Sequence, residues 1–405
     1  MRKLFSPLLP IAAIFLAGTT WAQAPANTVS LERWRQYAGV SWSRETNTEG
    51  RSARFTESVK TPIVGLHFDK KGVAYVSTPR LLSPNAPATL SVLDLTAKEG
   101  PARLTAFPST AANAIQGPAD RSLRNVLGFH VDQRNGWLWA LDMGFVAGES
   151  EAPAGAQKLL VFDLHNGKVV KSIPLDAVAD RKGSFLNDIA VDEKRKIAYV
   201  SDSGFRSAPN NMAGIIVVDF NSAKTRRVLH QHPAVQIEPG VKVYAHGEEV
   251  WPNNPLLVAI NGIALSPDAK TLYWTVTAGS KLHALPTAVL RNARSTDTQV
   301  AAAVRDLGAV GGNTDGIVTD RSGKLYITDV TRNGIVQFDP RKRSVKLLAS
   351  NDHVFWPDTA AVGPGNALYF TASNLNNHFA GAIADGQERY DIWKMPLNPA
   401  GDTRH

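Results

Sequence analysis

Short runs in which apolar and polar residues alternate recur along the chain. Each run opens with small or polar residues and is followed by a turn and a second apolar run rich in Tyr or Trp, as in 127–132 followed by 137–142. An alternation with a period of two is typical of β-strands with one buried face, and the Gly, Asp and Asn residues between the runs indicate turns. The pattern therefore predicts an all-β protein that repeats a pair of strands.

The strand pair occurs six times at intervals that suit propeller blades. The second positions of the opening residue pairs are 65, 128, 188, 262, 316 and 358, so the intervals range from 42 residues (316 to 358) to 74 residues (188 to 262). Later apolar runs, such as 158–163 and 214–219, supply further strands. A repeat of this size with four short strands is the signature of a β-propeller, and few amphipathic helices of the kind that a parallel α/β fold needs are present. We predict one six-bladed β-propeller with four-stranded blades over residues 49–398.

The geometry of a ring gives three further expectations. Gly opens four of the copies, at positions 65, 128, 262 and 316, where the inner strands converge on the axis and space is short. The sixth copy has no room for four strands before 390–395, so we expect residues from about 50 to 60 to complete it. The segment 231–255 is expected to be a loop insertion on one face of the disc.

The N-terminus has the features of a secretory signal peptide. Arg2 and Lys3 precede an apolar run at 8–17, and small-x-small cleavage sites end at Ala22 and at Ala24. We predict cleavage after one of these two residues and a secreted or periplasmic mature protein. No later segment is long and apolar enough to hold the mature protein in a membrane. The predicted parts are a signal peptide (1–22), an N-terminal extension (23–48), the propeller (49–398) and a C-terminal tail (399–405).

Composition removes several classes of chemistry. The 405 residues include no Cys, which excludes disulfide scaffolds, thiolate zinc sites, iron–sulfur clusters and cysteine nucleophiles. The net charge of +8 is scattered, with its densest cluster at 341–343, and no basic helix appears, so nucleic acid is not an expected partner. The sequence also lacks a nucleophile elbow, a phosphate-binding loop and a dinucleotide fingerprint. We expect a monomer whose partner is a small molecule.

Asn and Asp residues open the inner strands of four successive copies. They are Asn187, Asp188, Asn261, Asp315 and Asp358. Asn and Asp at strand starts often close turns, and this structural interpretation applies to each residue alone. Their shared phase, however, places them around one axis and predicts a polar ligand site at the tunnel mouth. Trp356 lies beside Asp358, and we expect it to contact the ligand.

Two His residues share a later phase of the repeat. His67 and His130 stand at the same position in the first two copies, where imidazoles that face the tunnel could act as acid–base groups. Because strand residues alternate between faces, both could instead pack between blades. The Asp residues that end inner strands are assigned to turns; they are Asp69, Asp132, Asp192 and Asp320.

Several of these runs resemble a known family. The stretch 136–144 (GWLWALDMG) is similar to the G-x-LW-x-LD-x-G segment of the Yellow/major royal jelly proteins. Further matches follow in order at 185–192, 199–204, 262–268, 315–317, 326–331 and 356–359. The resemblance implies a secreted six-bladed propeller. The animal members have disulfides that this chain cannot form, because it has no Cys.

The wider superfamily includes gluconolactonases and paraoxonases, and this resemblance implies a divalent cation, usually Ca²⁺, at the tunnel mouth. Asn187, Asn261 and Asp315 match metal-binding residues of three blades, and their oxygen atoms suit a hard cation. The Glu that the superfamily places in the first blade is missing, because the first copy opens without an acidic residue. Asp188 and Asp358 could supply the missing charge.

Three functions follow from these residues, and the sequence does not decide whether the protein is an enzyme. The first is binding of a small molecule, such as an aromatic amine or an indole-like compound, at the tunnel mouth. The second is an isomerase that resembles the dopachrome-converting activity ascribed to Yellow relatives, in which His67, His130 or Asp315 moves a proton. The third is a calcium-dependent lactone hydrolase, in which the cation polarises the carbonyl group and Asp315 activates water.

Overall fold

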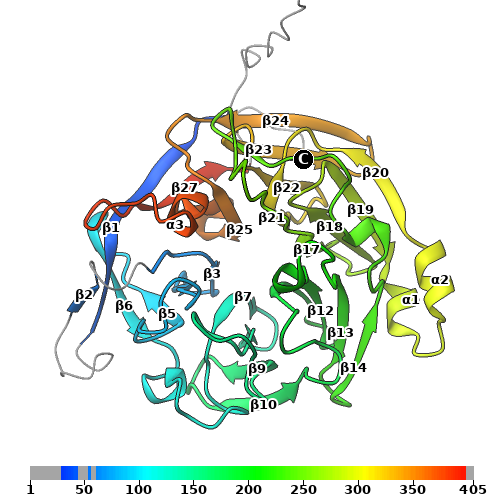
Figure 1. Ribbon diagram of the computed structural model, residues 1–405, viewed down its shortest axis with the longest axis horizontal. Helices are drawn as coiled ribbons and strands as arrows, with labels where there is room; N and C mark the ends of the chain where they lie inside the picture. The colour runs from blue at the N-terminus through cyan, green and yellow to red at the C-terminus, as the bar shows by residue number, and fades with distance from the viewer. Residues whose placement is uncertain (1–28, 44–52, 56–60, 398–405) are drawn as a thin grey trace, which may run out of the picture.

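The computed structural model describes residues 29–43, 53–55 and 61–397. Within these residues the regular secondary structure is almost entirely β-strand, and the sheets are arranged around a common centre like the blades of a propeller (Figure 1). The all-β, propeller-like fold predicted from the alternating pattern is confirmed.

Four sheets contain four strands each, in chain order. They are β7 (Val126–Asp132), β8 (Trp137–Asp142), β9 (Lys158–Asp163) and β10 (Val169–Pro174); β11 (Leu186–Asp192), β12 (Ile197–Asp202), β13 (Gly214–Asp219) and β14 (Lys224–Val228); β17 (Ile260–Leu265), β18 (Thr271–Val276), β19 (Lys281–Pro286) and β20 (Arg305–Ala309); and β21 (Thr314–Thr319), β22 (Leu325–Asp329), β23 (Gly334–Asp339) and β24 (Ser344–Ser350).

A fifth sheet has nine strands in the order β25-β26-β27-β1-β6-β5-β4-β3, with β2 paired to β1 beside this path. Its strands are β1 (Glu32–Trp42), β2 (Ala53–Phe55), β3 (Leu66–Phe68), β4 (Ala74–Ser77), β5 (Leu90–Leu93), β6 (Glu99–Ala106), β25 (Pro357–Gly363), β26 (Ala367–Ala372) and β27 (Tyr390–Pro396). The connections contain the hairpin β15 (Tyr244–Ala245) and β16 (Glu248–Glu249), the helices α1 (Thr287–Arg291), α2 (Asp297–Ala302) and α3 (Leu375–Phe379), and the 3₁₀ turns η1 (Ala111–Asn113), η2 (Phe205–Ser207), η3 (Pro233–Val235) and η4 (Pro364–Asn366).

The inner strands form a closed circle. Contacts run from β3 to β7, β11, β17, β21 and β25 and back to β3. The last step joins residues far apart in sequence: the Thr371 hydroxyl donates to the Val64 carbonyl at 2.7 Å, and the Ser373 hydroxyl donates to the Ile63 carbonyl at 2.5 Å. Both bonds are buried, so they hold the two ends of the array together away from competing water.

The strand beside β27 corrects one expectation. This strand is β1, which pairs antiparallel with β27 and parallel with β6, whereas within 50–60 the described strand β2 pairs only with β1. The alternation hides β1 because Arg35 occupies a buried position beside Tyr37. The two terminal nitrogens of the Arg35 guanidinium donate there to the carbonyl oxygens of Trp34 and Leu95 at 2.8 and 2.9 Å. The segment assigned to an extension thus contributes a strand to the ring.

Some predicted parts lie outside the described residues. These are the signal peptide (1–22), both cleavage sites and the C-terminal tail (399–405), which stay predictions. In the portion that the structure covers, no helix is long and apolar enough to cross a membrane.

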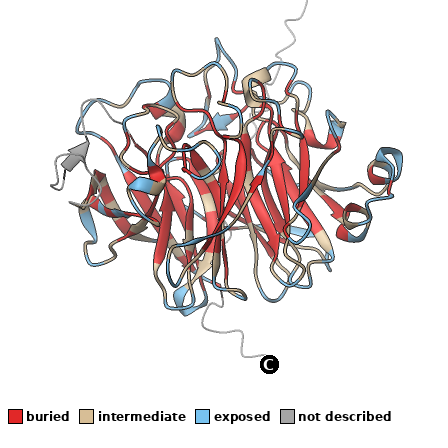
Figure 2. Cartoon of the chain, turned by 90° about the horizontal axis from the view of Figure 1, so that it is seen from below, coloured by how far each residue is buried: buried red, intermediate tan, exposed pale blue. Residues whose placement is uncertain are grey.

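The core lies between the sheets. The inner and middle strands are buried over most of their length, whereas outer strands such as β10, β20 and β24 are largely exposed or half-buried, and further exposed residues collect in the loops at the two ends of the ring (Figure 2). Large aromatic side chains of the second strands are buried there, as their place in the repeat predicts; they are Trp139, Tyr199, Tyr273, Tyr326 and Tyr369.

Two glycines allow neighbouring inner strands to touch backbone to backbone. A Cβ atom built on Gly262 would overlap the carbonyl oxygen of Asp315, and one on Gly316 would overlap the carbonyl oxygen of Asp358. A backbone atom cannot swing aside as a side chain does, so any larger residue must push two strands apart.

We predict that Gly262→Ala lowers the free energy of unfolding by about 2 to 3 kcal/mol, because overpacking of this kind forces backbone shifts. Gly240→Ala is the matched control: it meets the left-handed backbone penalty at φ +78° but no atom within 4 Å, so it should cost only about 1 kcal/mol. Chemical denaturation of both variants measures the difference. Equal losses would show that the strands can separate freely near the axis.

Candidate functional site

A β-bulge interrupts five successive inner strands at the same point, the first of them in β7 between Val126 and Phe129. The pairing of β11 shifts between Leu186 and Asp188, and corresponding shifts occur near the starts of β17, β21 and β25. A bulge places an extra residue in the strand and re-aims its side chain. The residues within these shifts include Asn187, Asn261, Asp315 and Asp358.

These four bulge residues line one cavity of about 270 Å³, which we call the acid pocket. All four are buried, and Trp356 lines the same cavity. The rest of the wall is mainly apolar and comes from the loops at this end of the ring; it includes Phe145, Phe185, Phe205, Trp251 and Leu256. A few convergent polar groups in an apolar cavity are the usual construction of a small-molecule site.

Asp315 is the best-connected residue of the acid pocket. Its Oδ2 accepts a hydrogen bond from the Trp356 indole at 2.6 Å, and its Oδ1 accepts one from the Asn261 amide at 2.5 Å. The same amide nitrogen also donates to the Thr277 hydroxyl at 2.8 Å. The carboxyl group is therefore held rigidly while its remaining lone pairs face the cavity.

Burial raises the pKa values of three carboxyl groups at the centre of the ring, and neighbouring carboxylate charges add to the rise at two of them. Burial raises the pKa of Asp315 to about 7, against the lowering effect of its Trp356 and Asn261 donors, and the charge of Asp188 adds to the rise. Burial also raises the pKa of Asp188 to about 6. The pKa of Asp358 is raised well above its ordinary value by burial and then by the charges of Asp315 and Asp188. Near neutral pH this cluster holds protons that isolated carboxyls would have lost.

Two Trp residues of the pocket have unusual backbones. Trp251 and Trp356 have φ angles of +52° and +56°, in the left-handed region that bulky residues rarely adopt. The Trp251 indole donates to the carbonyl oxygen of Asn376, in α3, at 3.1 Å. Strained positions of this kind cluster at functional sites, because the surrounding structure must hold them in place.

A second, larger cavity lies at the other end of the tunnel. This basal cavity has a volume of about 810 Å³, and its lining includes Asp188, His67 and His130. The two imidazole rings have centroids 5.9 Å apart, and the His130 Nε2 lies 3.0 Å from the Glu193 Oε1. Burial and then the nearby His130 lower the pKa of His67 to about 3, so His67 is neutral at physiological pH.

The structure therefore divides the predicted site residues between two cavities. Asn187, Asn261, Asp315, Trp356 and Asp358 line the acid pocket, whereas Asp188, His67 and His130 line the basal cavity. Alternation along a strand does not predict that Asn187 and Asp188 line different cavities, because the division depends on the bulge between Leu186 and Asp188. Sequence reasoning missed Glu193 of the basal cavity, whose only signal is its position in a turn after β11. It also missed the aromatic wall of the acid pocket, because these residues lie in loops that share no phase of the repeat. The missed aromatics are Phe145, Phe185, Phe205 and Trp251.

The Asp residues assigned to turns are found there. Asp69 and Asp320 each accept backbone N–H groups from the turns that follow β3 and β21. Asp132 and Asp192 do the same after β7 and β11.

The donor set of the acid pocket suits a hard cation. Its oxygen atoms come from Asn187, Asn261, Asp315 and Asp358, the ligand types that Ca²⁺ prefers. Among the described residues, no group of three or more His, Asp and Glu side chains is placed to hold a metal ion, so any such site would depend on the Asn amides.

The circle of sheets and its central polar pocket define a propeller-like protein. The model of the family "Major royal jelly protein" matches residues 125–403. This match covers more than half of the chain, and the chain belongs to the major royal jelly protein family.

Three solved structures match the chain over most of its length but share little sequence with it. A gluconolactonase from Xanthomonas campestris is 16% identical over 84% of this chain and 88% of its own, with a TM-score of 0.46. A luciferin-regenerating enzyme is 11% identical over 84% and 92%, with a TM-score of 0.49. A chain of a nidogen/laminin complex is 13% identical over 74% and 83%, with a TM-score of 0.43. No curated protein matches the sequence.

The carboxyl cluster makes stability depend on pH in a defined direction. Folded-state pKa values of about 6 and 7 lie above the ordinary value near 4, so the folded chain binds more protons between those limits. The contribution of these groups to the free energy of unfolding therefore falls as the pH rises from about 4 to 7.

We predict that Asp358→Asn raises the melting temperature at pH 8 and leaves it nearly unchanged at pH 4, because the amide removes a charge that only the higher pH creates. Thermal unfolding at both pH values measures this, and Asp352→Asn, at an exposed position, is the control. A lower melting temperature of Asp358→Asn at pH 8 would contradict this prediction and show that a neighbouring group stabilises the charged Asp358 carboxylate.

Proposed function

We propose that the acid pocket binds a small aromatic amine. The observation that carries this proposal is a pair of buried carboxyl groups, Asp315 and Asp358, in an aromatic-walled cavity without a basic partner. Among the described residues that line the pocket, the basic one is Arg206, whose guanidinium lies 3.9 Å from the ring centroid of Phe145 and donates to the Glu149 carbonyl at 2.8 Å. A ligand ammonium group would supply the missing positive charge.

The two halves of such a ligand match the two parts of the pocket. The ammonium group donates to carboxylate oxygens of Asp315 and Asp358, where charge-assisted hydrogen bonds are strong because water is excluded. The aromatic ring packs against Trp356 and the Phe residues of the wall, and the volume of about 270 Å³ suits a bicyclic ring. Ca²⁺ would use the same oxygen atoms, and when bound it would supply Lewis-acid polarisation of a carbonyl group.

Calorimetric titration with tryptamine tests the proposal. We predict that tryptamine binds, that its affinity rises from pH 5.5 to pH 8 as Asp315 loses its proton, and that indole-3-acetate binds at least about tenfold more weakly. Asp315→Asn should weaken tryptamine binding by about tenfold or more, whereas the exposed control Asp352→Asn should not change it. Equal affinities for the amine and the acid would contradict the proposal, and binding of Ca²⁺ without binding of tryptamine would favour the lactone hydrolase alternative.

A second candidate function is proton transfer on such a ligand. It is favoured by the pKa of Asp315 near 7, which lets the carboxyl both accept and donate a proton at neutral pH. We predict that, if dopachrome is converted, the rate follows the ionisation of Asp315 with a midpoint near pH 7 and falls by about a hundredfold or more in Asp315→Asn. Spectrophotometric assay of dopachrome decay measures this, and a rate unchanged in the variant would assign any conversion to another group.

We also infer that the ring has six blades and that the chain is exported. The nine-stranded sheet divides at the parallel pairing of β1 with β6 into two four-stranded sets, β25-β26-β27-β1 and β6-β5-β4-β3. These sets and the four separate sheets make six, in agreement with the circle of six inner strands. Export rests on the signal peptide predicted at 1–22.

A further inference from the structure

The mouth of the basal cavity carries a ring of basic side chains. In five consecutive copies, the turn after the inner strand has a basic residue shortly after its Asp; these residues are Lys71, Arg134, Lys194, Lys270 and Arg321. Four of them line the basal cavity, and Lys71 lines an adjoining hollow that shares Phe68 and Gln133 with it. Basic residues that look scattered along the sequence are thus gathered by the repeat.

The acidic residues of the same turns offset only part of this ring, because they are engaged within the turns: the Glu193 Oε2 accepts the N–H group of Arg134 at 2.9 Å, and Asp192 pairs with Arg195 at 2.8 Å. The Asp132 Oδ1 accepts the N–H groups of Arg134 and Asn135 at 3.0 and 2.8 Å, and the Asp192 Oδ1 accepts that of Arg195 at 3.0 Å. Both carboxyls are buried, because closing the turn requires them to face inward.

The basic side chains, by contrast, point outward. Lys270 is paired with Asp268 at 3.2 Å, whereas Arg134, Lys194 and Arg321 are exposed and make no ion pair within the described ranges. These three residues therefore leave positive charge at the mouth.

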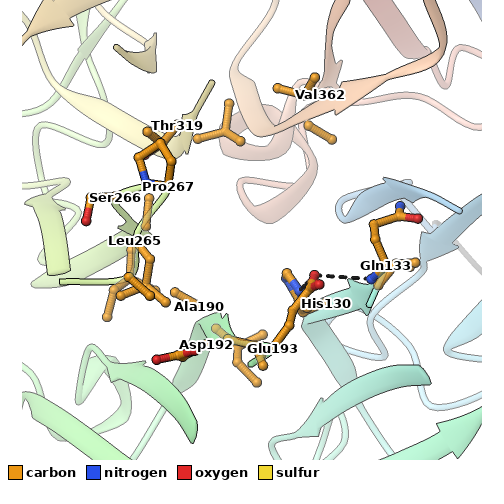
Figure 3. Close-up of a pocket in the computed structure, with 18 of the residues that line it drawn as sticks. His130, Gln133, Ala190, Asp192, Glu193, Leu265, Ser266, Pro267, Thr319 and Val362 are labelled. Atoms are coloured by element: carbon orange, nitrogen blue, oxygen red, sulfur yellow. Dashed lines mark hydrogen bonds and ion pairs between the residues drawn. The ribbon is translucent and has the colours of Figure 1, made fainter. Parts of the chain in front are cut away.

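Behind the mouth the walls combine polar side chains with a continuous set of apolar ones. They are formed by inner-strand residues that include Ile189, Ala190, Ile263, Leu265, Ile317 and Val362. Figure 3 shows Leu265 and Pro267 across the cavity from His130 and Glu193. The hydrogen-bond contact between His130 and Glu193 occupies one side, and Asp188 lies toward the acid pocket, close enough to Asp315 and Asp358 to affect their pKa values.

We propose that the basal cavity is a second ligand site, which takes an amphiphilic organic anion. The apolar body lies between the inner strands, and the anionic head lies among Arg134, Lys194 and Arg321 at the mouth. The charges along the axis set this orientation, because the Asp188 carboxyl at the inner end of the cavity repels an anionic head while the basic ring attracts it. The same basic ring excludes organic cations from this end of the tunnel.

The test uses 8-anilinonaphthalene-1-sulfonate, whose fluorescence rises in apolar surroundings, with displacement by octanoate, octylammonium or inorganic sulfate. We expect saturable binding of the dye to the folded chain and displacement by octanoate but not by octylammonium or sulfate. The mouth variant Arg134→Gln/Lys194→Gln/Arg321→Gln should weaken octanoate binding by about tenfold.

Two controls separate the mouth charge from other effects. Lys224→Gln/Arg341→Gln/Lys346→Gln removes the same charge from exposed positions that do not line the cavity and should bind octanoate like the unmodified chain. Asp315→Asn should also leave octanoate binding unchanged, so the amine proposal and this one fail independently.

Absence of saturable dye binding, or equal displacement of the dye by octylammonium and octanoate, would overturn the proposal. Equal displacement by sulfate would also overturn it, because it would indicate a surface that responds to charge alone. So would an equal loss of octanoate affinity in the mouth variant and the control variant. Circular dichroism confirms that each variant is folded before it is titrated.

Discussion

The contact between the backbones of neighbouring inner strands is the constraint on which the site depends. Gly128 lies against the carbonyl group of Asn187, Gly262 against that of Asp315, and Gly316 against that of Asp358, in each case too closely for a Cβ atom. Each contact therefore fixes the distance from one inner strand to the bulge of the next. The polar side chains meet in one pocket because the strands that carry them cannot move apart.

This close approach has an electrostatic consequence. It brings Asp188, Asp315 and Asp358 together in a buried space, where burial opposes the ionisation of all three and the charges of Asp188 and Asp315 further oppose that of Asp358. Hydrogen bonds from Trp356 and Asn261 to Asp315 offset part of the free-energy cost of burying this carboxyl group. The tunnel consequently has a polarity, with carboxyl groups in the middle and basic side chains at the basal mouth.

Much of this arrangement could be predicted from the phase of the repeat. Phase placed Asn187, Asn261, Asp315 and Asp358 around one axis, and all four line one pocket. Phase could not separate Asp188 from its neighbour, because the bulge that does so depends on hydrogen-bond register rather than on residue type.

The remaining misses have similar physical causes. β1 contains a buried Arg whose partners are carbonyl groups, and a hydrophobic pattern does not register such a residue. The aromatic wall of the acid pocket comes from connections of irregular length, which carry no periodic signal. The sequence did not predict the basic ring, because its members are far apart in the chain and share only a position shortly after the Asp of a turn.

We propose that the carboxyl groups of the acid pocket lack a basic partner, are partly protonated near neutral pH and bind a ligand cation. The most direct test is the number of protons released when tryptamine binds at pH 6, obtained by calorimetry in buffers of different ionisation enthalpy. We predict net proton release at pH 6, because the bound ammonium group lowers the pKa of the carboxyl groups it contacts. The release should disappear near pH 8.5, where these groups have already lost their protons, and should be smaller in Asp315→Asn. Binding without proton release at pH 6 would contradict the proposal.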